Sequence, residues 1–197
     1  MKLTIKNLAK ISKAEVELNG ITVVAGYNST GKSTISKALL GVMSAYSNLS
    51  EKIMSQRSFE IQRVLDNAAS VDISAAVYLR RKTRMRRLAR TLSADRSLKL
   101  EEESLRFAAV EGLTEEETKQ IEQYIKAHFE EIQAEVEEKR DISEQDFASF
   151  LVNNQFRWIF DQQINTFGSD KACTIDLSAK EEIHLEIVNN KVVELPL

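Results

Sequence analysis

The sequence is poor in cysteine, proline and glycine. Its 197 residues include one cysteine, one proline and six glycines. A single cysteine, Cys173, excludes an internal disulfide and any metal site built from several cysteines, and it suits a reducing compartment. So few helix-breaking residues argue against an all-β or disordered chain and favour long helices joined by short loops.

Long apolar runs are also absent. No stretch approaches the roughly 20 apolar residues of a membrane span, and the N-terminal residues lack the basic start, apolar centre and small-residue cleavage site of a signal peptide. We therefore expect a cytoplasmic protein with no membrane partner.

The formal net charge of −3 hides an uneven distribution. Residues 80–96 hold eight Lys/Arg against one acidic residue, whereas residues 114–146 hold twelve Asp/Glu against four Lys/Arg. The bulk charge therefore says little about partners, and the two segments have to be considered separately.

Three short segments near the N-terminus have β-like patterns. Leu3–Lys6 and Ala14–Leu18 alternate between apolar and polar residues, which is typical of half-buried strands. Ile21–Ala25 is a continuous run, apolar apart from Thr22, which is typical of a strand covered on both faces. Asn19-Gly20 is a strong hairpin-turn signal between the second and third segments. The sequence thus predicts a small mixed sheet with Ile21–Ala25 as its central strand.

From Lys32 onward the apolar spacing becomes helical, and residues 50–167 are predicted to form successive helices. Gly112 marks the end of one helix, and Thr114 with Glu117 forms a predicted capping box that begins the next. The apolar stripe of that next helix consists of Ile121, Tyr124, Ile125, His128, Ile132 and Val136. A further helix start is predicted at Ser143.

Beyond Gly168 the period returns to two. Cys173–Leu177, Ile183–Val188 and Lys191–Leu195 are predicted strands, with Asn189-Asn190 as a turn. The predicted organisation is an α/β fold in three parts. Residues 1–49 form the N-terminal lobe of a P-loop NTPase, residues 50–167 form a large helical insertion or lid, and residues 168–197 add strands that complete the lobe.

One motif in the chain predicts chemistry. Residues 26–33 read Gly-Tyr-Asn-Ser-Thr-Gly-Lys-Ser and fit the G-x-x-x-x-G-K-[ST] pattern of a phosphate-binding loop without a mismatch. The motif follows a buried-type strand and precedes an amphipathic helix, which is the context that the pattern requires. We therefore predict a nucleoside triphosphate site, for ATP with Mg²⁺ as cofactors.

Each position of the loop has a predicted role. Backbone N–H groups from Asn28, Ser29, Thr30, Gly31 and Lys32 would converge on the phosphates at a helix N-terminus, and Gly26 and Gly31 let the backbone approach closely. Lys32 is the predicted catalytic residue, because its ammonium can lie between the β- and γ-phosphates. Ser33 can offer its hydroxyl to Mg²⁺, and Thr34 supports the α-phosphate.

Hydrolysis also requires an acidic residue for Mg²⁺ and a group that positions water, and neither is evident. A Walker B strand would be about four apolar residues followed by Asp-Glu. The nearest match, Trp158–Gln162, lies in a helical pattern and lacks the glutamate.

The start of the chain resembles the SMC/RecF-like ABC-type ATPase heads of the AAA family. The similarity covers about the first 45 residues and rests on the opening Leu3–Leu8 and on Val16–Thr34, which contains the G-x-N-x-x-G-K-S-T loop; the pair inside that loop that is usually Gly-Ser is Ser29-Thr30 here. The resemblance implies a head split into two lobes, of which the C-terminal one carries the signature motif, Walker B, D-loop and switch histidine. None of these motifs is found in residues 35–197, and no Q-loop glutamine can be selected.

The resemblance also implies partners and a biological role. A truncated or split protein is expected, and the partner would be a C-terminal ATPase lobe or a second head, with ATP held between two heads. The role would be ATP-dependent head engagement in DNA repair, chromosome handling or defence against foreign DNA. Two alternatives are a self-contained P-loop kinase with a helical lid and a module that senses ATP without hydrolysing it.

A dense basic cluster is the second candidate site. It consists of Arg80, Arg81, Lys82, Arg84, Arg86, Arg87 and Arg90. On a helix these side chains could neutralise several phosphates of DNA or RNA without reading the bases. The alternative interpretation is a solvated face, or a face paired with the acidic segment 114–146.

Overall fold

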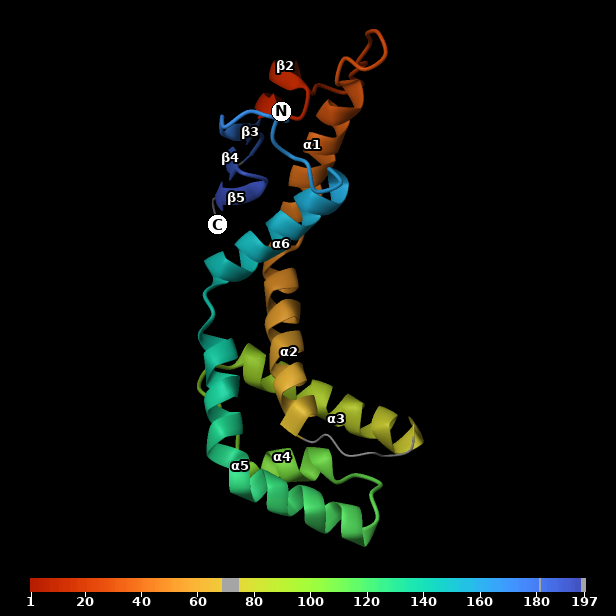
Figure 1. Cartoon of the computed structure of the whole chain (residues 1–197), viewed down its shortest axis with the longest axis vertical. Helices are drawn as coiled ribbons and strands as arrows, with labels where there is room; N and C mark the ends of the chain where they lie inside the picture. The colour runs from red at the N-terminus through yellow and green to blue at the C-terminus, as the bar shows by residue number, and fades with distance from the viewer. Residues whose placement is uncertain (69–74, 181, 196–197) are drawn as a thin grey trace. The chain divides into compact units, whose positions relative to one another are not determined.

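The computed structural model describes residues 1–68, 75–180 and 182–195 and contains two compact units (Figure 1). One unit joins Met1–Leu49 with Gln145–Leu197, and the other is Ser50–Glu144. We call them the sheet unit and the helical unit and describe each by itself. The predicted insertion covers residues 50–167, and the helical unit covers Ser50–Glu144.

The sheet unit contains five strands in the order β2-β1-β3-β4-β5. The bounds are β1 Lys2–Leu8, β2 Ile11–Glu17, β3 Cys173–Ser178, β4 Glu182–Val188 and β5 Lys191–Glu194. The N-terminal and C-terminal strands share one sheet, as expected, since β1 pairs with β3 through Leu3↔Leu177 and Ile5↔Ile175. Every neighbouring pair is antiparallel, so the prediction of a mixed sheet is wrong.

Two tight turns set the register of this sheet. Asn189 and Asn190 join β4 to β5 with φ of 50° and 60°, the left-handed conformation that asparagine tolerates, as the sequence predicts. The hairpin of β1 and β2 turns at Ala9-Lys10, because Leu8 pairs with Ile11. The sequence gives no signal for this second turn, since Ala9 adopts a φ of 47° that alanine rarely takes.

The predicted central strand Ile21–Ala25 is not formed, which is a second correction. Residues 22–26 have no assigned secondary structure, and the side chains of Ile21 and Val23 are 95% and 81% exposed. An apolar run becomes a buried strand only when neighbouring strands satisfy its backbone and other elements cover its faces. The strands in the described part of the chain pair with one another and leave this run alone.

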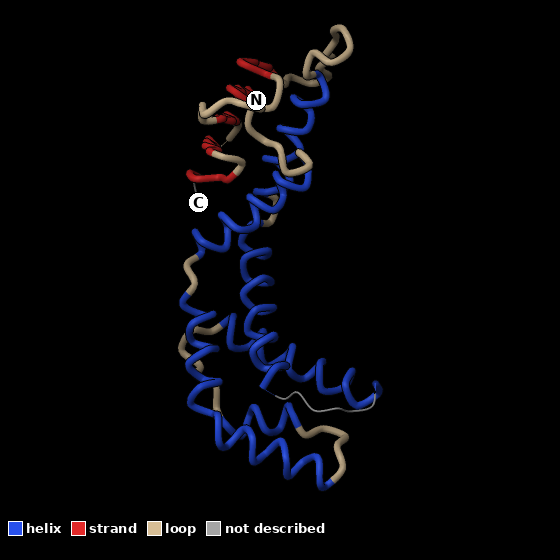
Figure 2. The backbone as a smooth tube through the Cα atoms, in the orientation of Figure 1, coloured by secondary structure: helices blue, strands red, loops and turns tan. Residues whose placement is uncertain are grey.

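Helices α1 (Lys32–Tyr46) and α6 (Glu144–Ile159) pack with the sheet, and Figure 2 shows both beside the strands. Gly41 of α1 faces Phe156 of α6 so closely that a Cβ at Gly41 would lie 2.9 Å from the ring. The Asn153 side chain of α6 accepts a 2.6 Å hydrogen bond from the backbone N–H of Val192 in β5. These contacts explain why α6 belongs to the sheet unit and not to the helical one.

The helical unit consists of α2 (Leu49–Ala68), α3 (Ala75–Ala94), α4 (Glu102–Ala109) and α5 (Glu115–Asp141). Its core is one apolar cluster contributed by all four helices. The capping box that the sequence predicts is present: the Thr114 hydroxyl accepts from the Glu117 N–H, and the Glu117 carboxylate accepts from the Thr114 N–H at 2.7 Å.

The predicted apolar stripe of α5 is correct in part. Ile121, Ile125, Ile132 and Val136 are buried. Tyr124 is 48% exposed and His128 is only partly buried, because both lie at the edge of the stripe, where their rings stack on each other with centroids 4.2 Å apart. In the described part of the chain, no helix is both long enough and apolar enough to cross a membrane.

Candidate nucleotide-binding site

The predicted phosphate-binding loop leads directly into α1. Gly31 is the N-cap residue with φ of 92°, and the backbone N–H groups of Thr34 and Ile35 bond its carbonyl at 3.0 and 3.3 Å. No side chain caps the helix, and the first turn contains no acidic residue. The first N–H groups of a helix have no partner within the helix and carry partial positive charge, so this end is suited to an anion.

Gly31 is fixed by its contact with the sheet. A Cβ at Gly31 would lie 2.9 Å from Cγ1 of Ile11 in β2, so the loop rests directly on an apolar side chain of the hairpin. Its positive φ adds a second reason for glycine at this position. The sequence reveals the glycine through the motif, but it gives no signal for Ile11, which lies 20 residues earlier in the chain.

Lys32 closes the loop on itself. Its Nζ donates a 2.6 Å hydrogen bond to the carbonyl of Gly26 and a second, short one to the carbonyl of Tyr27. The Thr30 hydroxyl also donates to the Tyr27 carbonyl, at 2.9 Å. The ammonium is therefore held at the mouth of the loop. Tyr27 takes part through its backbone, which no side-chain pattern could indicate.

The remaining loop residues are open to solvent. Gly26, Asn28, Ser29, Thr30 and Ser33 are exposed, and Gly31, Lys32 and Thr34 are partly exposed. Ser33, with a free hydroxyl at the second helical position, and Lys32 form the donor set that a triphosphate with Mg²⁺ requires. The residues present thus fit the cofactors.

The Walker B candidate is the end of a helix and a turn. Helix α6 ends at Ile159, and Asp161 and Gln162 follow with φ of 50° and 71°. The Asp161 side chain is 92% exposed, and its carboxylate lies 4.0 Å from Nζ of Lys37. A Walker B aspartate ends a buried strand, so this segment lacks the required geometry.

The basic cluster is divided by the structure. Arg81 is buried, and Arg84 forms an ion pair with Glu111 and lies over the Phe107 ring, with its guanidinium carbon 4.4 Å from the ring centroid. The exposed members are Arg80, Lys82, Arg86, Arg87 and Arg90. The basic surface is therefore smaller than the sequence suggests.

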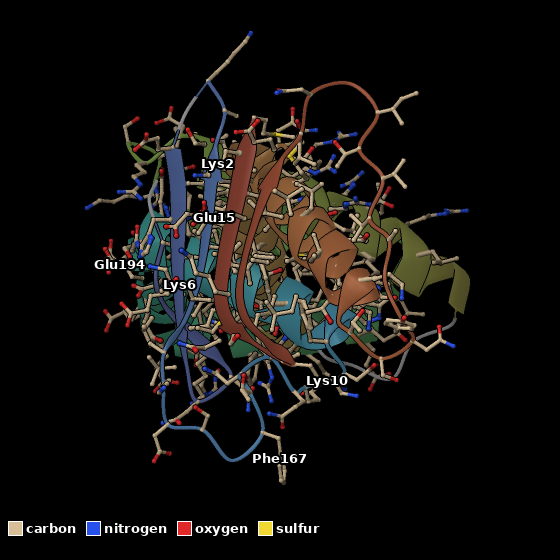
Figure 3. The ribbon with its side chains drawn as sticks, turned by 90° about the horizontal axis from the view of Figure 1, so that it is seen from above. Lys2, Lys6, Lys10, Glu15, Phe167 and Glu194 are labelled. Carbon is tan, nitrogen blue, oxygen red and sulfur yellow. The ribbon has the colours of Figure 1, made fainter. Side chains whose placement is uncertain are left out.

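Strand pairing gathers another group of ionisable side chains on the exposed face of the sheet. Figure 3, a view from above, labels Lys2, Lys6, Glu15 and Glu194. Lys2 and Glu15 form an ion pair at 3.1 Å across β1 and β2. Potential ligand atoms of His184, Glu186 and Glu194 lie within 4.8 Å of one another, and Nδ1 of His184 contacts Asp176. Sequence spacing does not reveal this group, because strand register brings its members together. Exposed acidic clusters of this kind are common, and we assign no function to it.

Comparison with known proteins identifies the family. An AAA domain family model matches residues 2–192, which include both the phosphate-binding loop and all five strands apart from the last residues of β5. No curated protein matches the chain, and no solved structure does. AAA domains are P-loop ATPase domains that generally bind ATP with Mg²⁺, and the matched residues include the predicted loop at Gly26–Thr34. The chain therefore belongs to the AAA domain family.

Proposed function

We propose that this chain is the N-terminal lobe of an SMC/RecF-like ATPase head, which binds ATP with Mg²⁺ and becomes an ATPase when a C-terminal lobe joins it. The observation that carries the proposal is the exposed apolar run Ile21–Ala25, which leads into the loop. This run lies directly before the phosphate-binding loop and has the pattern of a buried strand. Its exposure is what we expect of a lobe whose neighbouring strands come from a partner.

The residues of the loop would have distinct roles in nucleotide binding. Lys32 would leave the two loop carbonyls that it now contacts and neutralise charge at the β- and γ-phosphates. The uncapped N–H groups at the start of α1 would hold phosphate oxygens, and the Ser33 hydroxyl would be a ligand for Mg²⁺. Bound Mg²⁺ supplies charge neutralisation on the phosphates. The missing carboxylate and water-positioning groups would come from the C-terminal lobe.

Head engagement would then be the output of the ATP cycle. In this proposal two heads hold ATP between them, and the engaged pair acts on DNA in repair, chromosome handling or defence against foreign DNA. The resemblance of the N-terminal segment to SMC/RecF-like heads supports the DNA-related role. The exposure of the phosphate-binding loop supports the shared site, since an exposed loop cannot exclude water by itself.

The decisive experiment measures ATP binding and turnover separately. Calorimetric titration with ATP and Mg²⁺ should give binding to the chain alone, and turnover should require addition of an SMC/RecF-type C-terminal lobe. Val23→Glu should abolish lobe-dependent turnover while leaving ATP affinity unchanged, because Val23 is 81% exposed in the sheet unit. Val193→Glu is the matched control, since Val193 is 59% exposed on β5, away from the apolar run.

Two results would contradict the proposal. Turnover or a phosphorylated acceptor produced by the chain alone would indicate a self-contained P-loop enzyme such as a kinase. ATP binding that never leads to turnover beside any such lobe would indicate a nucleotide sensor.

A further inference from the structure

A groove in the helical unit, between α2 and α3, is a feature that the phosphate-binding loop leaves unexplained. It has a volume of about 640 Å³. Its lining combines apolar, hydroxyl and basic side chains with the carboxylate of Glu51 and the amide of Gln62. The α2 side includes Met54, Ser58 and Phe59, and the α3 side includes Leu79, Lys82, Arg86 and Arg90.

The apolar part of the groove is open to solvent. Phe59 is 54% exposed, Met54 is 46% exposed and Leu79 is 62% exposed. Three large apolar side chains gathered in one hollow and rimmed by polar groups are typical of a surface that binds another protein.

The basic part forms one regular wall. Lys82, Arg86 and Arg90 follow each other at intervals of four residues along α3, so each is about 6 Å further along the helix than the last. A helix that lies along this wall with carboxylates at the same interval would meet every cation in turn.

Helix α5 carries a stripe with carboxylates at this interval on a face that borders its buried residues. Glu131 and Glu135 are exposed and four residues apart, with Ala127 and Ala134 beside them as small exposed residues. One helical turn before Ala127 lies Tyr124, an exposed aromatic whose ring is held against His128. The stripe therefore offers an aromatic anchor followed by paired carboxylates.

Glu135 acts within its own helix, where Glu138 first and, more weakly, Glu135 raise the pKa of Lys139. Among residues 1–68, 75–180 and 182–195, the ion pairs include none with Arg86, Arg90, Glu131 or Glu135. The nearby pairs involve other groups: Arg84 with Glu111, and Arg106 with Glu122. The helical unit thus keeps a basic groove and an acidic stripe that complement each other and are both accessible.

We propose that the α5 stripe of one copy of this chain docks in the α2–α3 groove of a second copy. Each copy has one groove and one stripe, so a two-fold pair forms the same contact twice. Tyr124 would enter among Phe59, Met54 and Leu79, and Glu131 and Glu135 would face Arg86 and Arg90. A polyanion such as DNA suits the observations less well, because its phosphates would match the basic wall and leave the apolar side chains exposed. The contact needs no nucleotide, so it is separate from the head engagement proposed above.

Charge reversal on each side provides a test that uses the whole chain without ATP. Sedimentation at low salt should show dimers for the parent chain. The double variants Arg86→Glu/Arg90→Glu and Glu131→Arg/Glu135→Arg should each raise the dimer dissociation constant about tenfold or more, because like charges then face each other. In an equimolar mixture of the two variants both contacts are complementary again, so heterodimers should form although neither variant dimerises alone.

The matched control is Arg80→Glu/Arg87→Glu. It changes the charge of the same helix by the same amount, and neither residue lines the groove. This control should dimerise like the parent chain, and circular dichroism should show that all variants remain folded.

Three results would overturn the proposal: a monomeric parent chain at high protein concentration, failure of the mixture to form heterodimers, or equal loss of dimer in the control. A monomeric parent chain that binds duplex DNA, with the salt dependence reduced equally by both pairs of arginine replacements, would assign α3 to nucleic acid instead.

Discussion

Replacing Lys32 tests the nucleotide site most directly. Its Nζ is held by the carbonyls of Gly26 and Tyr27 at the mouth of the loop, so the ammonium is already within the motif that would receive a triphosphate. Lys32→Met keeps most of the aliphatic stem and removes the charge. A hydrogen bond to a charged group contributes about 1.5–3 kcal/mol, and every 1.4 kcal/mol is tenfold in affinity. ATP should therefore bind about 10 to 150 times more weakly.

The effect on folding should be much smaller. Lys32 is only partly buried, and its bonds go to loop carbonyls that solvent can reach, so the variant should lose about 1 kcal/mol of stability or less. Calorimetric titration with ATP and Mg²⁺ measures the affinity, and thermal unfolding on the same samples measures the stability.

A second lysine on the same helix serves as the control. Lys37 lies one turn beyond the loop, its side chain is 45% exposed, and its nearest charged partner is Asp161 at 4.0 Å. Lys37→Met should leave ATP affinity within about threefold of the parent, since exposed pairs contribute about 0–1 kcal/mol. Equal affinity of Lys32→Met and the parent chain, or equal losses in the two variants, would refute the site assignment.

Three further outcomes follow from the geometry. Gly31→Ala should destabilise the sheet unit by about 1–3 kcal/mol in denaturant titration, because the new Cβ meets Ile11 and the φ of 92° is unfavourable for alanine; an unchanged midpoint would contradict the contact. Thr114→Ala should cost about 1 kcal/mol by removing the capping box. The hydrogen bonds from Thr114 lower the pKa of Glu117, so the cap stabilises the fold above the ordinary glutamate pKa, and this contribution disappears as the pH falls through the lowered pKa. The stability difference between the parent chain and Thr114→Ala should therefore shrink over that pH range. A difference that stays constant there would argue against the link. Burial raises the pKa of Cys173 to about 12, so the thiol should be inert to alkylation at neutral pH until the sheet unit unfolds, and rapid labelling of the native protein would disprove its burial.

Local sequence signals were sufficient to predict features that depend on a few adjacent residues. The Asn189-Asn190 turn, the Thr114 capping box and the strands at both ends of the chain were predicted because each depends on a few adjacent residues. The start of α1 at Lys32 was predicted for the same reason, since the phosphate-binding motif specifies a glycine turn followed by a helix.

The errors concern features that depend on partners distant in the chain. The two-residue alternation of apolar and polar side chains predicted strands, but it could not give their relative direction. The antiparallel pairing of β1 with β3 therefore appeared only in the structure. The apolar pattern of Ile21–Ala25 predicts a strand if other elements cover both faces of the run. The sequence does not show whether such elements are present, and in the structure Ile21 and Val23 are exposed. The sequence also could not show that Arg81 is buried or that Arg84 pairs with Glu111, because both depend on how the helices pack.

The sequence by itself predicted the phosphate-binding motif at Gly26–Thr34, and it determined the start of the helix that follows and the alternation of helical and strand segments, because hydrogen bonds and side-chain periodicity act over a few residues. Only the tertiary structure decided that α6 packs with the sheet, that Ile11 supports Gly31 and that Lys32 turns back onto the loop. These features arise from contacts between segments that are separate in the chain, and such contacts are selected by the packing of the whole unit.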